Sequence, residues 1–230
     1  MKTRASARTA VSIPAESCSL EGWLTVPSPA RGAVAFAHGS GSGRFSPRNQ
    51  FVAEALNQAG LATLLLDLLE EREAADRRHV FDISLLANRL LLAAFWLEQQ
   101  PATQGLSLGY FGASTGAAAA LVAAAREPRL VSAVVSRGGR PDLAGGLLPQ
   151  VQAPTLLIVG GEDDVVVDLN TQALHDLVCP RELIVIPGAT HLFPEPGALE
   201  EVANLAARWF IRYLAPTACA VPQVRAMGNA

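Results

Sequence analysis

The sequence predicts an α/β fold whose mostly parallel central sheet has helices on both faces. Strand-like runs alternate with helix-length segments along nearly the whole chain. Most of the strand-like runs are apolar throughout, as expected of parallel strands that are buried on both faces. With 230 residues, 50% hydrophobic and 17% charged, the chain can bury one sizeable core. We therefore expect a single domain over residues 1–214 and a loosely held tail over residues 215–230.

Seven strands are predicted, each a short run bounded by glycine, proline or charge. The first, residues 19–27, alternates polar and apolar residues and ends at Pro27, which is typical of an antiparallel strand. The other six have the continuous apolar character of buried parallel strands. They are residues 32–39, 61–69, 106–113, 130–138, 154–161 and 181–188.

Five helices are predicted between and after these strands, and the first of them stops at Gly60. They span residues 47–60, 81–100, 115–127, 169–178 and 197–214. In an open parallel sheet, functional groups collect at the carboxyl ends of the strands. The loops at those ends carry the segments AHGSGSGR, GASTG, SRGGR, GGEDD and GATH.

Net charge, cysteine positions and apolar stretches limit which binding partners and which cellular location we expect. A formal net charge of −3 offers no basic footprint for nucleic acid or an anionic membrane, so a small molecule is the expected partner. Cys18, Cys179 and Cys219 lie far apart and at no metal-binding spacing, so we expect free thiols and no metal site. The chain starts without a secretory h-region, and its longest apolar stretch, LLLAAFWL, is too short for a membrane span. These features predict a cytoplasmic protein that is a monomer or a small homo-oligomer.

Ser114 lies in the pattern G-x-S-x-G with Gly112 and Gly116, between an apolar strand-like run and an alanine-rich helix-like run. This pattern is typical of a nucleophile elbow, a tight strand-to-helix turn that exposes the serine hydroxyl. Glycine is expected at the flanking positions because a side chain there would collide with a neighbouring strand or helix. An ordinary Gly/Ser turn is the alternative. Because strand, turn and helix all agree with the elbow, we predict Ser114 as a catalytic nucleophile.

A serine nucleophile needs a base, which in elbow-type folds is a histidine placed later in the chain. Two histidines follow Ser114. His175 falls inside a helical period, where a solvated helix face is the simpler interpretation. His191 lies in a short loop directly after the strand-like run 181–188. We therefore predict His191 as the general base.

The base must itself be oriented by an acid, expected between the serine and the histidine in the chain. Glu162, Asp163 and Asp164 stand in a row directly after the strand-like run 154–161. Asp163 is preferred because it reaches the carboxyl edge soon after the strand and leaves Glu162 as a loop spacer. Asp164 remains the alternative.

The glycine-rich segment HGSGSGR follows an early strand and allows two interpretations. Dinucleotide binding fails on spacing, because the glycines run G-x-G-x-G and Ser46-Pro47 interrupts the position where a helix should begin. A loop that folds over the nucleophile fits better. We expect the backbone N–H groups of Ser40 and Thr115 to form an oxyanion hole. His38 is expected to maintain the conformation of this loop and not to transfer a proton.

Two arginines lie near the carboxyl edge: Arg137 at the end of the strand-like run 130–138 and Arg140 in the connection that follows it. Their forked donors could bind a substrate carboxylate. Pairing with Asp142 or with a backbone carbonyl is the structural alternative. The connection has only about fifteen residues, too few for a large helical lid. An open site suits small soluble esters better than long-chain lipids.

The segments HGSGSGRFSPRN, GYFGASTGAAAAL, SRGGRPDLA, PTLLIVGGEDD and PGATHLF resemble those of α/β-hydrolases of the dienelactone-hydrolase-like branch. The resemblance runs from about Val11 to Leu214. It extends to a bacterial subgroup in which some members are joined to a phosphoribosyltransferase domain, although we expect no such domain in this chain. The subgroup pattern G-G-x-D implies that Asp163 is the acid. Dienelactone hydrolase itself carries cysteine at the position of Ser114, which favours a general serine esterase here.

The sequence thus predicts an α/β-hydrolase fold without a large lid domain and a serine hydrolase of small carboxylic esters. The expected chemistry is acyl transfer from the ester to Ser114 and then to water, without a metal or an organic cofactor. An acyltransferase would use the same triad with an alcohol in place of water. A catalytically idle scaffold is the other alternative, although such proteins usually lose a triad member.

Overall fold

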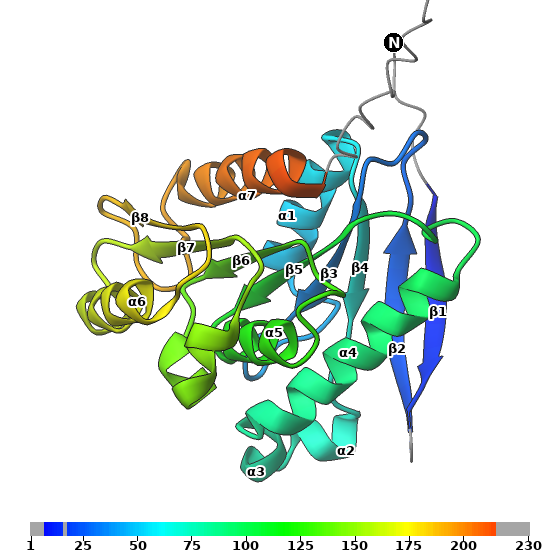
Figure 1. The fold of residues 1–230 in the computed structure, drawn as a ribbon, viewed down its shortest axis with the longest axis horizontal. Helices are drawn as coiled ribbons and strands as arrows, with labels where there is room; N and C mark the ends of the chain where they lie inside the picture. Colours follow the sequence, from blue (N-terminus) through cyan, green and yellow to red (C-terminus); the bar gives the residue numbers. More distant parts are fainter. Residues whose placement is uncertain (1–6, 16–17, 215–230) are drawn as a thin grey trace, which may run out of the picture.

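The structure is a computed structural model that describes residues 7–15 and 18–214. Within these residues an eight-stranded sheet runs in the order β1-β2-β4-β3-β5-β6-β7-β8 (Figure 1). The strands from β4 to β8 in this order are parallel, whereas β2 pairs antiparallel with both β1 and β4. The strands are β1 (Arg8–Pro14), β2 (Ser19–Thr25), β3 (Ala33–Ala37), β4 (Ala62–Leu66), β5 (Leu108–Ala113), β6 (Ala133–Arg137), β7 (Thr155–Gly160) and β8 (Arg181–Ile186). The predicted fold class and its antiparallel strand over 19–27 are confirmed.

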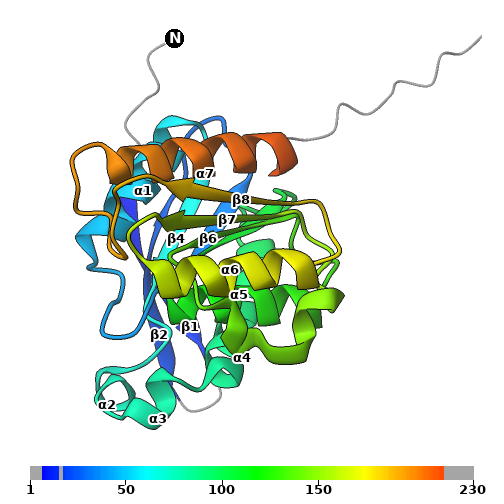
Figure 2. The ribbon, with the colours of Figure 1, turned by 90° about the vertical axis from the view of Figure 1, so that its left-hand side faces the viewer.

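Helices cover both faces of the sheet, as Figures 1 and 2 show. α1 (Pro47–Gln58) and α7 (Ala198–Leu214) pack together on one face. α4 (Ile83–Gln99), α5 (Thr115–Arg126) and α6 (Asp164–Asp176) lie on the other. The remaining helical pieces are short: α2 (Glu71–Ala74), α3 (Arg77–Val80) and the 3₁₀ segment η1 (Pro141–Gln150). As predicted, no large separate lid domain occurs in the described part of the chain.

The core consists of two apolar layers, one on each side of the sheet. β5 shows why its sequence is apolar without interruption. Phe111 joins the layer under α1 and α7, whereas its neighbour Tyr110 joins the layer under α4 and α5. Both side chains are fully buried. A strand that is covered on both faces needs apolar residues at every position. This explains the uninterrupted apolar run in the sequence.

Some elements differ from the prediction. β1 was not predicted, because it is an outer strand whose side chains are mostly exposed, with Ile13 buried opposite Leu20 of β2. α6 begins at Asp164, earlier than the predicted start at residue 169. The short helices α2 and α3 were not predicted either, since four residues are too few to show a helical period.

Among the described residues, no helix is long and apolar enough to cross a membrane. The tail predicted over residues 215–230 lies outside the described residues. The domain boundary at residue 214, the cytoplasmic location and the oligomeric state remain predictions.

Candidate active site

Ser114 occupies the turn between β5 and α5. It is one of two residues other than glycine with a positive φ in the described chain, with φ 51° and ψ −121°. This backbone conformation is costly for a residue with a side chain, and such strain gathers at functional sites. It is also the conformation of a strand-to-helix elbow. Ser114 is half-buried in a region whose neighbours are buried.

Two flanking glycines allow the turn to form. A Cβ at Gly112 would lie 2.4 Å from the Cα of Ala117, and a Cβ at Gly116 would lie 2.1 Å from the carbonyl oxygen of Ala37. Both distances are impossible for real atoms. The collisions involve α5 on one side and β3 on the other, which confirms the steric reason predicted from the sequence.

His191 and Asp163 meet at the carboxyl edge of the sheet. The His191 Nδ1 and Asp163 Oδ2 atoms are 2.6 Å apart. Asp163 is the N-cap residue of α6 and its side chain makes no capping hydrogen bond, so the carboxylate is free to hold the imidazole. Asp164, the alternative acid, is exposed in the first turn of α6. Since a carboxylate only accepts, Nδ1–H donates to Asp163 and Nε2 remains as the free nitrogen of the neutral ring.

Gly138 connects His191 to the elbow. The Ser114 N–H donates to the carbonyl oxygen of Arg137 at 3.2 Å, and Gly138 follows directly. A Cβ at Gly138 would lie 3.5 Å from both Cε1 and Nδ1 of the His191 ring, so the ring packs against this glycine. Between Ser114 and His191, which are both described, the structure shows no hydrogen bond. Catalytic hydrogen bonds are often long in free enzymes and tighten when substrate binds.

The two predicted oxyanion donors flank the elbow. Thr115 is the first residue of α5, where a helix leaves its N–H groups without intrahelical partners. Ser40 lies in the loop after β3, and a Cβ on its neighbour Gly39 would lie 3.0 Å from the Ser114 Cβ. Neither N–H donates to an acceptor among the described residues. Two free donors therefore lie on either side of the serine.

Two contacts from the end of β4 hold the loop after β3, residues 38–46, in place. The buried ring of His38 accepts the Leu68 N–H at Nε2, 2.9 Å away, and its Nδ1 lies 3.0 Å from the Gly39 carbonyl oxygen. Burial lowers the pKa of His38, so the ring stays neutral. Arg44 donates to Asp67 from its backbone N–H at 2.6 Å and from its guanidinium. These contacts fit the predicted role of His38 in loop geometry, whereas the Arg44–Asp67 pair was not predicted.

Arg137 and Arg140 lie in different surroundings. Arg140 donates to both carboxylate oxygens of Asp142, at 2.8 and 2.7 Å, which is the structural alternative considered for it. Arg137 is only 6% exposed and lies over Phe111, with its Cζ 6.0 Å from the ring centroid. No carboxylate of the described residues pairs with it, and its Nη1 is buried without a hydrogen-bond partner. Burial, together with the nearby charge of Arg48, lowers the pKa of Arg137 to about 10.

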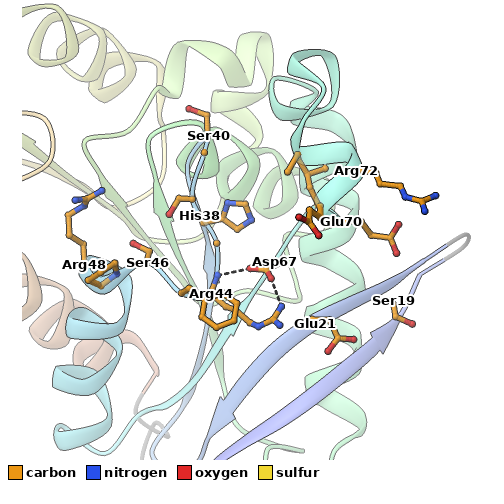
Figure 3. Close-up of a pocket in the computed structure, with 18 residues that line it drawn as sticks. Ser19, Glu21, His38, Ser40, Arg44, Ser46, Arg48, Asp67, Glu70 and Arg72 are labelled. Atoms are coloured by element: carbon orange, nitrogen blue, oxygen red, sulfur yellow. Dashed lines mark hydrogen bonds and ion pairs between the residues drawn. The ribbon is translucent and has the colours of Figure 1, made fainter.

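Two cavities open beside the loop after β3. The larger, about 1110 Å³, runs from this loop past the end of β4 to α2 and β2. Figure 3 shows charged side chains around it, among them the Arg44–Asp67 pair, Glu70 and Arg72. The smaller, about 260 Å³, also borders His38 and Ser40 but reaches Thr115 beside the elbow. Neither cavity could be predicted from a local pattern, because its walls combine segments that are far apart in the chain.

The remaining histidines lie outside this site. His175 is exposed on α6, as predicted, and His79 belongs to the short helix α3. Among the described residues, no group of three or more His, Cys, Asp or Glu side chains could hold a metal ion. Cys18 and Cys179 are free thiols.

The strand order, the elbow after β5 and the histidine loop after β8 are those of an α/β-hydrolase. A sequence model of the dienelactone hydrolase family matches residues 48–215, which is more than half of the chain. The chain therefore belongs to the dienelactone hydrolase family.

The chain is also similar to a curated relative and to solved structures. A putative phosphoribosyl transferase of Mycobacterium tuberculosis (strain CDC 1551 / Oshkosh) is 60% identical over 205 residues, covering 89% of this chain and 46% of that protein. The chain thus spans less than half the length of this curated relative. The crystal structure of a dienelactone hydrolase from Anabaena variabilis is 57% identical, with a TM-score of 0.89 over 92% of this chain and 100% of the other. Est1E from Butyrivibrio proteoclasticus, at 16% identity, a TM-score of 0.75 and 88% and 98% coverage, shares the fold.

Proposed function

We propose that this protein is a serine hydrolase that cleaves small soluble carboxylic esters through an acyl-enzyme on Ser114. The observation that carries the proposal is the 2.6 Å contact between His191 Nδ1 and Asp163 at the edge where Ser114 occupies its elbow. Family membership supports a hydrolase, and the serine in the elbow supports ester chemistry on a hydroxyl nucleophile.

In the proposed mechanism, His191 Nε2 takes the proton from Ser114 Oγ while Oγ attacks the ester carbonyl carbon. The carbonyl oxygen becomes an oxyanion and accepts hydrogen bonds from the N–H groups of Ser40 and Thr115. Collapse of this intermediate breaks the bond to the leaving oxygen, which takes the proton from His191. Asp163 holds the ring and stabilises its charged form. A water molecule then repeats the sequence, so that the carboxylic acid leaves and Ser114 is restored.

The surroundings of the elbow support small substrates. The connection between β6 and β7 contains only the 3₁₀ segment η1, so no helical lid from that connection covers the serine. The larger cavity is open and lined by many charged side chains, which suits soluble esters rather than lipid.

The test is the hydrolysis of p-nitrophenyl acetate and butyrate by the wild-type protein and by Ser114→Ala. We expect turnover by the wild type, and a loss of about 10⁴-fold or more in kcat for the variant with an unchanged circular dichroism spectrum. Equal turnover by the two proteins would rule out Ser114 as the nucleophile. A wild type without turnover would instead favour an idle scaffold.

The same assay separates hydrolysis from acyl transfer. Adding a small alcohol to the reaction and separating the products shows whether the acyl group leaves as the acid or as a new ester. We expect the acid to dominate at millimolar alcohol. Predominant formation of the new ester would make the protein an acyltransferase with the same nucleophile.

A further inference from the structure

The smaller cavity lies at the meeting point of four segments beside the elbow. Its floor is the loop after β3 together with Thr115, the first residue of α5. Its roof comes from Leu69, from Val80 at the end of α3, and from Leu86 of α4. Ser40 and Thr115, whose N–H groups are the proposed oxyanion donors, both line it. An ester carbonyl held by these two donors therefore lies at the mouth of this cavity.

The walls suit an apolar group with one polar end. Leu69 and Leu86 are 7% and 2% exposed, and Val80 is half-buried. The opposite side is polar and is formed by His38, Ser40, Ser42 and Thr115. Among them, Thr115 has an Oγ1 that is buried and has no hydrogen-bond partner among the described residues. A buried hydroxyl without a partner is costly, and a bound polar group would relieve that cost. This hydroxyl belongs to a residue that also supplies an oxyanion donor, so the polar end of the cavity is the end nearest the carbonyl.

Strand order decides which part of the ester enters this cavity. The leaving oxygen must face His191, because it takes its proton from that ring. His191 follows β8 and packs against Gly138 after β6, on one side of β5 in the sheet. The cavity instead lies beyond β5 on the other side, where β3 and β4 end. The leaving group and the cavity are thus on opposite sides of Ser114, and the acyl group is the part that points into the cavity.

Hydrogen bonds of Arg89 hold the elements on this side of the cavity together, which gives the cavity a defined size. Arg89 of α4 donates from Nη2 to Glu73 of α2 at 2.7 Å and from Nη1 to the Leu68 carbonyl oxygen at 2.8 Å. Arg89 is only 6% exposed. The end of β4, α2 and α4 are therefore held together through one buried guanidinium.

We propose that this cavity is the acyl-binding site of the enzyme and that it selects compact acyl groups, straight, branched or aromatic. Its volume is about 260 Å³. If each non-hydrogen atom takes the ~30 Å³ that a water molecule occupies in the liquid, there is room for about eight. Butyryl, hexanoyl and benzoyl groups fit this limit and a hexadecanoyl group does not. This inference rests on the function proposed above. Substitutions at Leu86 and Ala74 test the acyl site.

The test compares kcat/KM across p-nitrophenyl acetate, butyrate, hexanoate, octanoate and benzoate, which share one leaving group. Leu86→Phe fills the cavity, and Ala74→Phe does so from its exposed rim, where a larger side chain can be accommodated without disturbing the core. Each should lower the hexanoate-to-acetate and benzoate-to-acetate ratios by about 10-fold or more. Leu86→Ala should shift the optimum towards octanoate. Leu92→Phe makes the same change on the exposed face of α4, where Leu92 is 37% exposed, and should keep the wild-type ratios.

Different outcomes test the assignment of the acyl site and the proposed function separately. If Leu86→Phe fails to fold, the ester ratios of Ala74→Phe test the acyl site instead. An active wild type whose ratios are unchanged in the folded filling variants would overturn the acyl assignment alone. A wild type that hydrolyses none of the esters would contradict the proposed function itself.

Discussion

Asp163 and Asp164 are neighbours in the chain but differ in what their carboxylates contact. Asp163 holds the His191 ring, whereas Asp164 is exposed at the start of α6. We expect Asp163→Asn to lower kcat for p-nitrophenyl butyrate by about 10³ to 10⁴-fold, because the amide no longer holds the required tautomer or stabilises the charged ring. Asp164→Asn should stay within a few-fold of the wild type. A severe loss confined to Asp164→Asn would reverse the assignment.

Arg137 and Arg140 permit a second test at the residue scale. Arg137 is a buried cation that no described carboxylate neutralises, while Arg140 is already paired with Asp142. We expect Arg137→Met to raise KM for a p-nitrophenyl ester that carries a carboxylate, such as the glutarate monoester, far more than KM for the neutral acetate.

Arg140→Met is the matched control and should change the two KM values equally. Removing an unpaired buried charge should leave the melting temperature of Arg137→Met unchanged or higher. Equal KM changes for both esters in Arg137→Met, or a marked loss of stability, would support a structural role for this arginine instead.

The sequence predicted the backbone geometry of the elbow well, because a local steric rule constrains it. Gly112, Ser114 and Gly116 form a pattern with a steric cause inside five residues, and the structure shows the collisions that exclude other side chains. The contact between Asp163 and His191 joins residues 28 apart in the chain, so no local pattern could show it. The preference for Asp163 over Asp164 therefore rested on spacing from the strand. The Arg44–Asp67 pair could not be predicted, since nothing local in either segment indicates the other.

Among the elements, α2 is joined to α4 through the Glu73–Arg89 ion pair. The hydrogen bond from Arg89 lowers the pKa of Glu73 below its usual value of 4.5. A carboxyl whose pKa is depressed by folding stabilises the protein above its unfolded pKa, and this stabilisation is lost as pH falls through the folded pKa. Glu73→Gln should therefore lower the melting temperature at pH 7, and this effect should shrink as the pH falls below 4.5. A difference between the two proteins that stays constant from pH 7 to pH 3 would contradict this.

Regular elements were predictable and short ones were not. The buried strands β3 to β7 and the helices α1, α4, α5 and α7 are recognisable from apolar runs or helical periods. β8 was expected to be a buried strand, but it is an edge strand in which only Ile186 is buried. α2 and α3 have four residues each and bury no side chain, so their sequence carries no period. Ala74 of α2 and Val80 of α3 line the smaller cavity. Part of the wall of the proposed acyl site thus comes from a segment that local patterns describe poorly.

For the molecule as a whole, the small volume of the cavity beside the elbow and the lack of a large lid among the described residues limit the substrate. We expect acetyl to butyryl esters of p-nitrophenol to be hydrolysed with far higher kcat/KM than the hexadecanoyl ester, because a sixteen-carbon chain does not fit the cavity of about 260 Å³. The rate should not rise sharply when the substrate forms micelles, since no large lid has to open. A maximum at sixteen carbons together with activation by micelles would contradict this.

Covalent labelling tests directly whether Ser114 is the nucleophile of a serine hydrolase. The purified protein is incubated with a fluorophosphonate probe, digested, and analysed by peptide mass spectrometry, with Ser114→Ala and Asp164→Asn treated in parallel. We expect the probe mass on the peptide that contains Ser114 in the wild type and in Asp164→Asn, and no labelling of Ser114→Ala. Labelling at another residue, or an unlabelled wild type, would contradict the account.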